Sequence, residues 1–218
     1  ILAACAALLD YARSTQGNRL THITSLRRES TSDFITLDPV TRRNLEITET
    51  LRGEDGPTLF KLLDHCSTTM GSRRLRYWLH HPLRDSSQAA ARHQGIEELL
   101  ENDQQRQLLA AELYEVPDLE RIAARVALGS VRPRELAALR EALPRVTRIA
   151  SLLESVAAPL LLTLRGQLAV PEGLQFLLTS GVIAGPAYSV RDGDVVAPGF
   201  DAELDELRVL RDNTGQFL

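Results

Sequence analysis

The fold class is decided by one continuous stretch, residues 118–143, which reads DLERIAARVALGSVRPRELAALREAL. Ala, Leu, Glu and Arg dominate it, and all four are strong helix formers. Gly129 closes a first helix, and Arg132-Pro133 opens a second. We expect Pro144 to interrupt that second helix, because proline lacks the backbone N–H that a helix interior needs. The stretch therefore predicts a mainly α fold.

Residues suited to a helix start recur along the chain, at Asp38, Thr58, Thr68 and Asp85. Asp38 is followed by Pro39, and we expect the helix that begins there to reach Ile47. Residues 1–15 place apolar side chains on one face of a helix. A last amphipathic helix begins at Asp201. These signals predict about ten helices.

Two short segments rich in Thr and Ile, residues 20–26 and 33–37, predict a small antiparallel β pair. A second pair is predicted over residues 188–197, where Asp192-Gly193 lies between two apolar runs and suits a type I′ turn. The expected fold is therefore a multi-helix domain with two small antiparallel β pairs.

The composition is that of an ordinary globular protein, with 44% apolar and 25% charged residues among 218. A compact chain of this length is expected to expose roughly 10,000 Å². No apolar run reaches about 18 residues, so we expect no membrane span. The two cysteines have no motif spacing, which favours a reducing, cytoplasmic setting.

The charge distribution does not favour direct binding to nucleic acid. The net charge is −4, with +2 on residues 1–90 and −6 on residues 91–218. A phosphate-binding loop of the G-x-x-x-x-G-K-[ST] type is absent, since the single lysine is Lys61. His65-Cys66 and His80-His81 are adjacent pairs whose side chains diverge by about 100° on a helix, which disfavours a metal site.

Two basic clusters leave alternatives open. The denser one surrounds Tyr77 and Trp78 and consists of Arg73, Arg74, Arg76 and Arg84. Its arginines either grip a nucleic-acid backbone, or pair with carboxylates of neighbouring helices while Leu75, Trp78 and Leu79 form a buried stripe. The second cluster, Arg42-Arg43, either contacts phosphate or forms salt bridges to a neighbouring domain.

Several motifs resemble the MutS family of DNA mismatch-repair proteins. The resemblance begins at residues 37–48, LDPVTRRNLEIT, and strengthens at residues 68–85, TTMGSRRLRYWLHHPLRD. Residues 118–143 are similar to the D-L-E-R-I-x-x-R segment of the family. Residues 190–208, VRDGDVVAPGFDAELDELR, resemble the hairpin and helix through which the family's core domain enters its clamp. The resemblance covers nearly the whole chain.

This resemblance implies a core, or lever, domain over residues 1–200, with residues 201–218 as the start of a lever helix leading into the clamp. The chain would then be cut at both ends. The resemblance also implies a homodimeric parent that acts on mismatched double-stranded DNA, works with a MutL-type partner and uses ATP and Mg²⁺. The segment itself is expected to be no enzyme and to hold no cofactor. No catalytic, cofactor-binding or metal residue is carried over to it.

The implied role is to couple ATP binding to clamp opening and mismatch engagement. Three alternatives remain. The first is a stand-alone helical protein-interaction module. The second is a MutS paralogue that handles recombination structures or stalled ribosomes. The third is an enzyme whose site has no recognisable motif.

Overall fold

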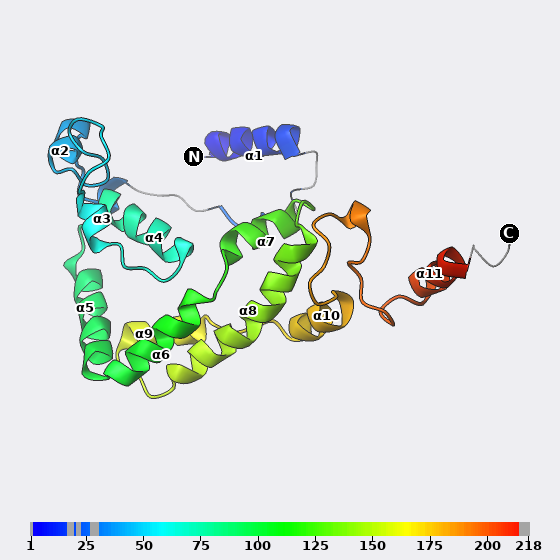
Figure 1. Ribbon diagram of the computed structural model, residues 1–218. Coiled ribbons are helices and arrows are strands. Elements are labelled where there is room, and N and C mark those ends of the chain that lie inside the picture. Colours follow the sequence, from blue (N-terminus) through cyan, green and yellow to red (C-terminus); the bar gives the residue numbers. More distant parts are fainter. Residues whose placement is uncertain (1, 17–19, 21–22, 27–30, 214–218) are drawn as a thin grey trace.

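The computed structural model describes residues 2–16, 20, 23–26 and 31–213, and these residues are mainly α-helical (Figure 1). The α-helices are α1 (Leu2–Gln16), α2 (Pro39–Asn44), α3 (Leu59–Leu63), α4 (Thr69–His80), α5 (Ser86–Glu101), α6 (Asp103–Tyr114), α7 (Leu119–Ala127), α8 (Pro133–Leu152), α9 (Pro159–Gly166), α10 (Leu174–Gly181) and α11 (Ala202–Asn213). Two 3₁₀ helices are η1 (Thr31–Asp33) and η2 (Val190–Asp192). The mainly α prediction is confirmed.

The helix starts follow the capping residues read from the sequence. The Asp38 carboxylate accepts hydrogen bonds of 2.9 Å from the backbone N–H groups of Val40 and Thr41, and Pro39 is the first helical residue. The side chains of Thr58, Thr68 and Asp85 cap α3, α4 and α5 as predicted, and Asp118, which was not among the predicted caps, caps α7. Each cap satisfies backbone N–H groups that have no partner within the helix.

Helix α2 ends earlier than expected. It stops at Asn44, because Glu46 adopts a left-handed backbone conformation with φ of 46° that a helix cannot continue through. The chain then turns so that Ile47 is buried, with only 4% of its surface exposed. The expectation of a helix reaching Ile47 is therefore wrong, although Ile47 is a core residue.

Helix α8 is continuous over 20 residues, so the predicted interruption at Pro144 is wrong. Pro144 lies on the exposed face, while its neighbours Ala142 and Leu143 are buried. The apolar contacts on either side of the proline hold both halves of the helix in place. Proline still removes one internal hydrogen bond, to the carbonyl of Arg140.

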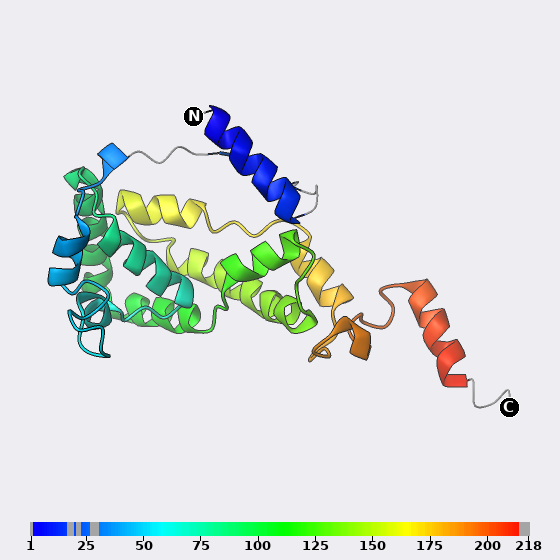
Figure 2. The ribbon, with the colours of Figure 1, turned by 90° about the horizontal axis from the view of Figure 1, so that it is seen from above.

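Two small apolar cores are joined by α8. The first lies between α6, α8 and α9 and contains Leu109, Ile149, Leu153, Val156, Ala158 and Leu161. The second lies between α8 and α10 and contains Leu143, Leu178 and Val182. Both views show α8 running through the middle of the molecule, with α5, α6 and α9 at one end and α10 at the other (Figures 1 and 2). One stiff helix therefore connects two packing centres.

Neither predicted β pair is confirmed. Residues 21–22 of the first pair, and residues 27–30 between its two segments, lie outside the described residues, and Phe34 forms an isolated antiparallel bridge with Leu83. The predicted hairpin over residues 188–197 is wrong, since Val190–Asp192 forms the 3₁₀ helix η2, closed by Ser189 and Asp192. Val196 bridges to Val182 at the end of α10, so tertiary contacts replace the hairpin.

The molecule is also less compact than expected. The chain exposes 16031 Å², against the roughly 10,000 Å² expected for a globular chain of this length. Helix α11 extends beyond the helical body in both views, and its Leu207, Val209 and Leu210 are exposed (Figures 1 and 2). Helix α1 likewise exposes Leu2 and Leu8. Helices that lie outside the two cores contribute to the extra surface.

Candidate functional site at the helix junctions

The junction between α4 and α7 is an ion pair that joins distant parts of the chain. Arg73 donates two hydrogen bonds to the Asp118 carboxylate, at 2.5 and 2.9 Å, and a third of 2.6 Å to Glu120. Thr69 donates a further bond of 3.2 Å to Asp118. Two parallel bonds between a guanidinium and a carboxylate fix orientation as well as distance.

The electrostatics of this junction favour its ionised state. The hydrogen bonds from Arg73 hold the pKa of Asp118 far below its usual range, against the opposing effect of burial. The carboxylate is shielded, since only 18% of the Asp118 side chain is exposed. Asp118 also accepts from the backbone N–H of Arg121 at the start of α7. One carboxylate therefore caps a helix and ties that helix to another.

The arginines around Trp78 all have partners within the chain. Besides Arg73, Arg74 lies over the rings of Tyr77 and Trp78, at 5.5 and 5.6 Å from their centroids. Arg76 lies 5.8 Å from the Phe60 centroid, and Arg84 donates to the Phe34 carbonyl at 3.3 Å. These contacts favour the structural interpretation of the cluster over direct contact with nucleic acid.

Trp78 itself is held by a residue that the sequence reasoning did not connect to it. The Arg92 guanidinium on α5 lies 3.8 Å from the Trp78 ring centroid, which joins α4 to α5. Leu75, Trp78 and Leu79 are half-buried, so the predicted buried stripe is only partly closed. No local signal identifies this pair, because the two residues come from different helices.

Helices α5 and α9 are joined by a cap supplied from a distance. Helix α9 has no side-chain cap of its own. The Glu98 carboxylate on α5 instead accepts hydrogen bonds from the backbone N–H groups of Ala157 and Ala158, at 2.6 and 2.7 Å. A carboxylate at a helix N-terminus is also favoured by the helix dipole. Gly95 packs beside this cap, close to Leu161.

Helix α8 is tied on several sides. Glu112 of α6 accepts from Arg148 at 2.8 and 3.0 Å and from Arg145 at 3.2 Å. The bonds from Arg148 lower the pKa of Glu112. The buried Gln105 amide donates to the Leu152 carbonyl at the end of α8. These contacts fix α6 against α8 along one edge.

The other edge of α8 holds α7 and α10. Glu135 accepts from Arg125 of α7 and, at 2.9 Å, from the backbone N–H of Arg132. Arg140 donates to the Val182 carbonyl at 2.7 Å, where α10 ends. Helix α8 is thus the common partner of α6, α7 and α10.

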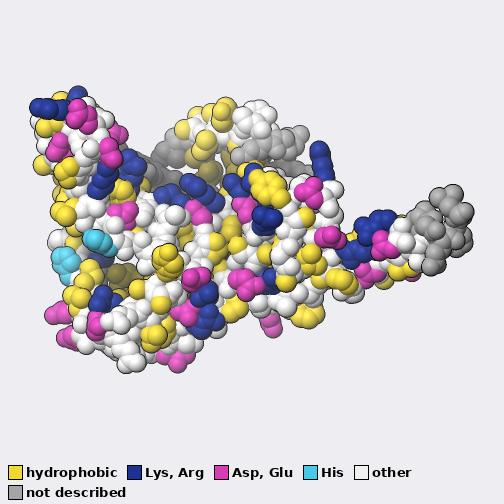
Figure 3. All heavy atoms as spheres, in the orientation of Figure 1, with side chains coloured by type: hydrophobic (Ala, Val, Ile, Leu, Met, Phe, Trp, Pro, Cys, Tyr) yellow, Lys and Arg dark blue, Asp and Glu magenta, His cyan; other side chains and the backbone are white. Residues whose placement is uncertain are grey.

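Within the described residues, no group of three or more His, Cys, Asp or Glu side chains is placed to hold a metal ion. Nor does any helix in the described part of the chain have the length and apolarity needed to cross a membrane. Figure 3 shows Arg and Lys interspersed with Asp and Glu over the visible face. Mixed charge of this kind suits junctions between helices better than an extended contact with a phosphate backbone.

These features define a class of protein in which a helical domain is built around one central helix and tied together by ion pairs. The family model for MutS domain III matches residues 40–216, which is most of the chain, and the chain therefore belongs to the MutS family as its domain III. MutS-family proteins act in DNA mismatch repair and are DNA-dependent ATPases. The resemblance seen in the sequence is confirmed.

Proposed function

We propose that this chain is the lever segment of a mismatch-recognition ATPase and couples ATP binding to clamp opening and mismatch engagement. The observation that carries the proposal is the position of α8 between two apolar cores. A helix of 20 residues is about 30 Å long and stiff along its axis. A displacement at one core is therefore transmitted to the other.

Coupling between two sites needs an element that both sites bias. The ion pairs that join the helices supply candidate elements, because they lie at partly exposed positions, such as Arg73 with Asp118 at the α4–α7 junction. Such contacts exchange partners more readily than an apolar core does. We propose that the α4–α7 junction changes its geometry between nucleotide states while α8 keeps its shape.

ATP and Mg²⁺ are assigned to another part of the whole protein. In the part of the chain that the structure describes, no group of three His, Cys, Asp or Glu side chains is placed to hold Mg²⁺, and the one lysine, Lys61, is paired with Asp55. Mismatched DNA, a second copy of the protein and a MutL-type partner belong to the same proposal, as does a cytoplasmic location.

The large exposed surface supports a place within a larger assembly. Contiguous apolar side chains on the outside of a helix mark contact surfaces for other parts of a protein. Helix α11 lies beyond the helical body (Figure 1), and its Leu207, Val209 and Leu210 are exposed. We propose that α11 leads towards the clamp.

The identity of the parent is tested with the whole protein that carries this domain. Fluorescence anisotropy measures its affinity for a duplex with one mismatch and for the matched duplex, with and without ATP. The lever proposal expects tighter binding to the mismatch and ATP-dependent release. Equal affinity for both duplexes would favour a paralogue with another DNA substrate, and the absence of both DNA and ATP binding would favour a stand-alone interaction module.

A further inference from the structure

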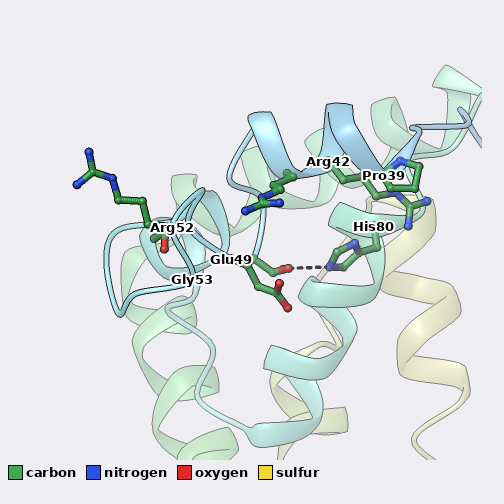
Figure 4. A pocket seen from close by; sticks show the side chains of 9 residues that line it. Pro39, Arg42, Glu49, Arg52, Gly53 and His80 are labelled. Atoms are coloured by element: carbon green, nitrogen blue, oxygen red, sulfur yellow. Dashed lines mark hydrogen bonds between the residues drawn. The ribbon is translucent and has the colours of Figure 1, made fainter.

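A pocket outside the junctions described above lies between α2, the following loop and the end of α4. Its volume is ≈ 440 Å³, and it is lined by Pro39, Arg42, Arg43, Thr48, Glu49, Thr50, Arg52, Gly53 and His80. Figure 4 shows the Arg42 and Glu49 side chains together with His80 at this pocket. Three arginines and one glutamate give the lining a net positive charge, although the chain as a whole has a charge of −4.

Arg42 carries a buried donor that is left unsatisfied at the pocket. Its Nε atom is buried and has no hydrogen-bond partner. By contrast, Arg43 donates to the Leu51 carbonyl at 2.8 Å. A buried donor without a partner is costly, and a charged acceptor placed in the pocket would offset the desolvation of the same guanidinium.

His80 reports on the electrostatics of the pocket. Thr48 Oγ1 lies 3.0 Å from His80 Nε2, which fixes the ring at the pocket wall (Figure 4). Burial, and then the positive charges of Arg42 and Arg76, hold the pKa of His80 below its usual range. The ring therefore lies in a positive field that only Glu49 opposes among the charges that shift its pKa. A site of this kind attracts an anion.

We propose that this pocket binds a small oxyanion, a phosphate group or a carboxylate, held by the guanidinium groups of Arg42 and Arg43. Both groups offer paired oxygens that match the fork of an arginine. Glu49 weakens the site by repulsion and so limits its affinity. The proposal does not depend on the lever function.

The test follows the His80 ring signals by NMR at pH 7, assigned by their loss in His80→Asn. Sodium phosphate or sodium acetate is titrated into the protein at constant ionic strength with sodium chloride as the balance. A saturable change in the His80 chemical shifts with either anion supports the proposal. The comparison of the two titrations shows whether the pocket binds phosphate alone, acetate alone or both. The absence of a saturable shift with both anions would overturn it.

Three variants separate binding from folding. Arg42→Gln is expected to weaken the anion affinity about tenfold or more. Arg52→Gln is the matched control, since Arg52 extends away from the other pocket side chains in Figure 4, and it is expected to change the affinity less than about twofold. Glu49→Gln is expected to strengthen binding severalfold, an effect that misfolding does not produce. Unchanged or weaker binding in Glu49→Gln would contradict the proposal, even if Arg42→Gln fails to fold.

Discussion

The Arg73 guanidinium holds the Asp118 carboxylate by two hydrogen bonds, of 2.5 and 2.9 Å, across 45 positions of the chain. The same carboxylate accepts the Arg121 backbone N–H at the start of α7. The start of one helix and the side of another therefore depend on a single ionised group. This arrangement makes the α4–α7 junction sensitive to one charge.

Replacing Asp118 by Asn tests the contribution of that charge. Asn also caps helix N-termini well, so the cap of α7 is retained while the ion pair with Arg73 is lost. We expect the free energy of unfolding to fall by about 1 kcal/mol at pH 7. Urea unfolding followed by circular dichroism measures it.

The stabilisation by the ion pair between Asp118 and Arg73 is expected to weaken as the pH falls. Because the folded-state pKa of Asp118 is depressed, the stabilisation is complete above the ordinary carboxyl value of about 3.9 and is lost as the pH falls below it. The stability difference between the wild type and Asp118→Asn should therefore shrink between pH 5 and pH 3. A difference that stays constant or grows over this range would show that the ion pair is not its source.

Glu98→Gln tests the cap that α5 supplies to α9. The neutral amide replaces one of the two carboxylate oxygens that accept from Ala157 and Ala158 by an NH₂ donor. We expect a loss of about 1–2 kcal/mol and faster hydrogen exchange at these two amides. Glu97→Gln is the matched control, because Glu97 is exposed on the same helix. Equal effects of the two substitutions would rule out a specific cap.

Substitutions at Gly95 test how closely α5 and α9 pack, because the size of the new side chain decides whether stability rises or falls. A Cβ at this position would lie 3.4 Å from Leu161 Cγ, which is ordinary contact. Gly95→Ala should therefore stabilise the protein by up to about 1 kcal/mol, because alanine favours the helix. Gly95→Leu should destabilise it, since the longer side chain collides with α9. Thermal unfolding of both variants checks this, and destabilisation by alanine would show that α5 and α9 lie closer together than described.

Pro144→Ala tests the continuity of α8. Alanine restores the N–H that bonds to the Arg140 carbonyl, and it fits a helix interior better than proline does. We expect the free energy of unfolding to rise by about 2 kcal/mol, because the higher conformational entropy of the unfolded alanine variant offsets part of the gain. Urea unfolding measures this change. Destabilisation would mean that the helix needs the bend that proline introduces.

Local features of the fold were predictable from the sequence, whereas the long-range contacts were not. Asp38, Thr58 and Thr68 cap helices because their oxygens bond to backbone N–H groups two or three residues away, so the neighbouring sequence contains the whole signal. The hairpin over residues 188–197 was wrong for the opposite reason. Val196 finds its partner in Val182, on a different element.

In the candidate site, too, the long-range contacts could not be predicted from the sequence. An acidic partner for an arginine such as Arg73 was foreseeable as an alternative, but its identity as Asp118 depends on how the fold brings the start of α7 to α4. Contact of Arg42-Arg43 with phosphate was one of the alternatives open from the sequence, but the pocket beside Arg42 was not foreseeable. It needs the turn at Glu46, whose positive φ no sequence pattern indicated, to bring Thr48 beside His80.

The central claim, that this helical core transmits signals between DNA and nucleotide, is tested most directly in the whole protein with Trp78→Ala. The measurement is the ratio of ADP release rates with mismatched and matched DNA, and Trp78→Phe, which keeps an aromatic ring under Arg92, serves as the control. We predict that the ratio falls about fivefold or more towards one in Trp78→Ala and is largely kept in Trp78→Phe. An unchanged ratio in a stably folded Trp78→Ala protein would contradict the account.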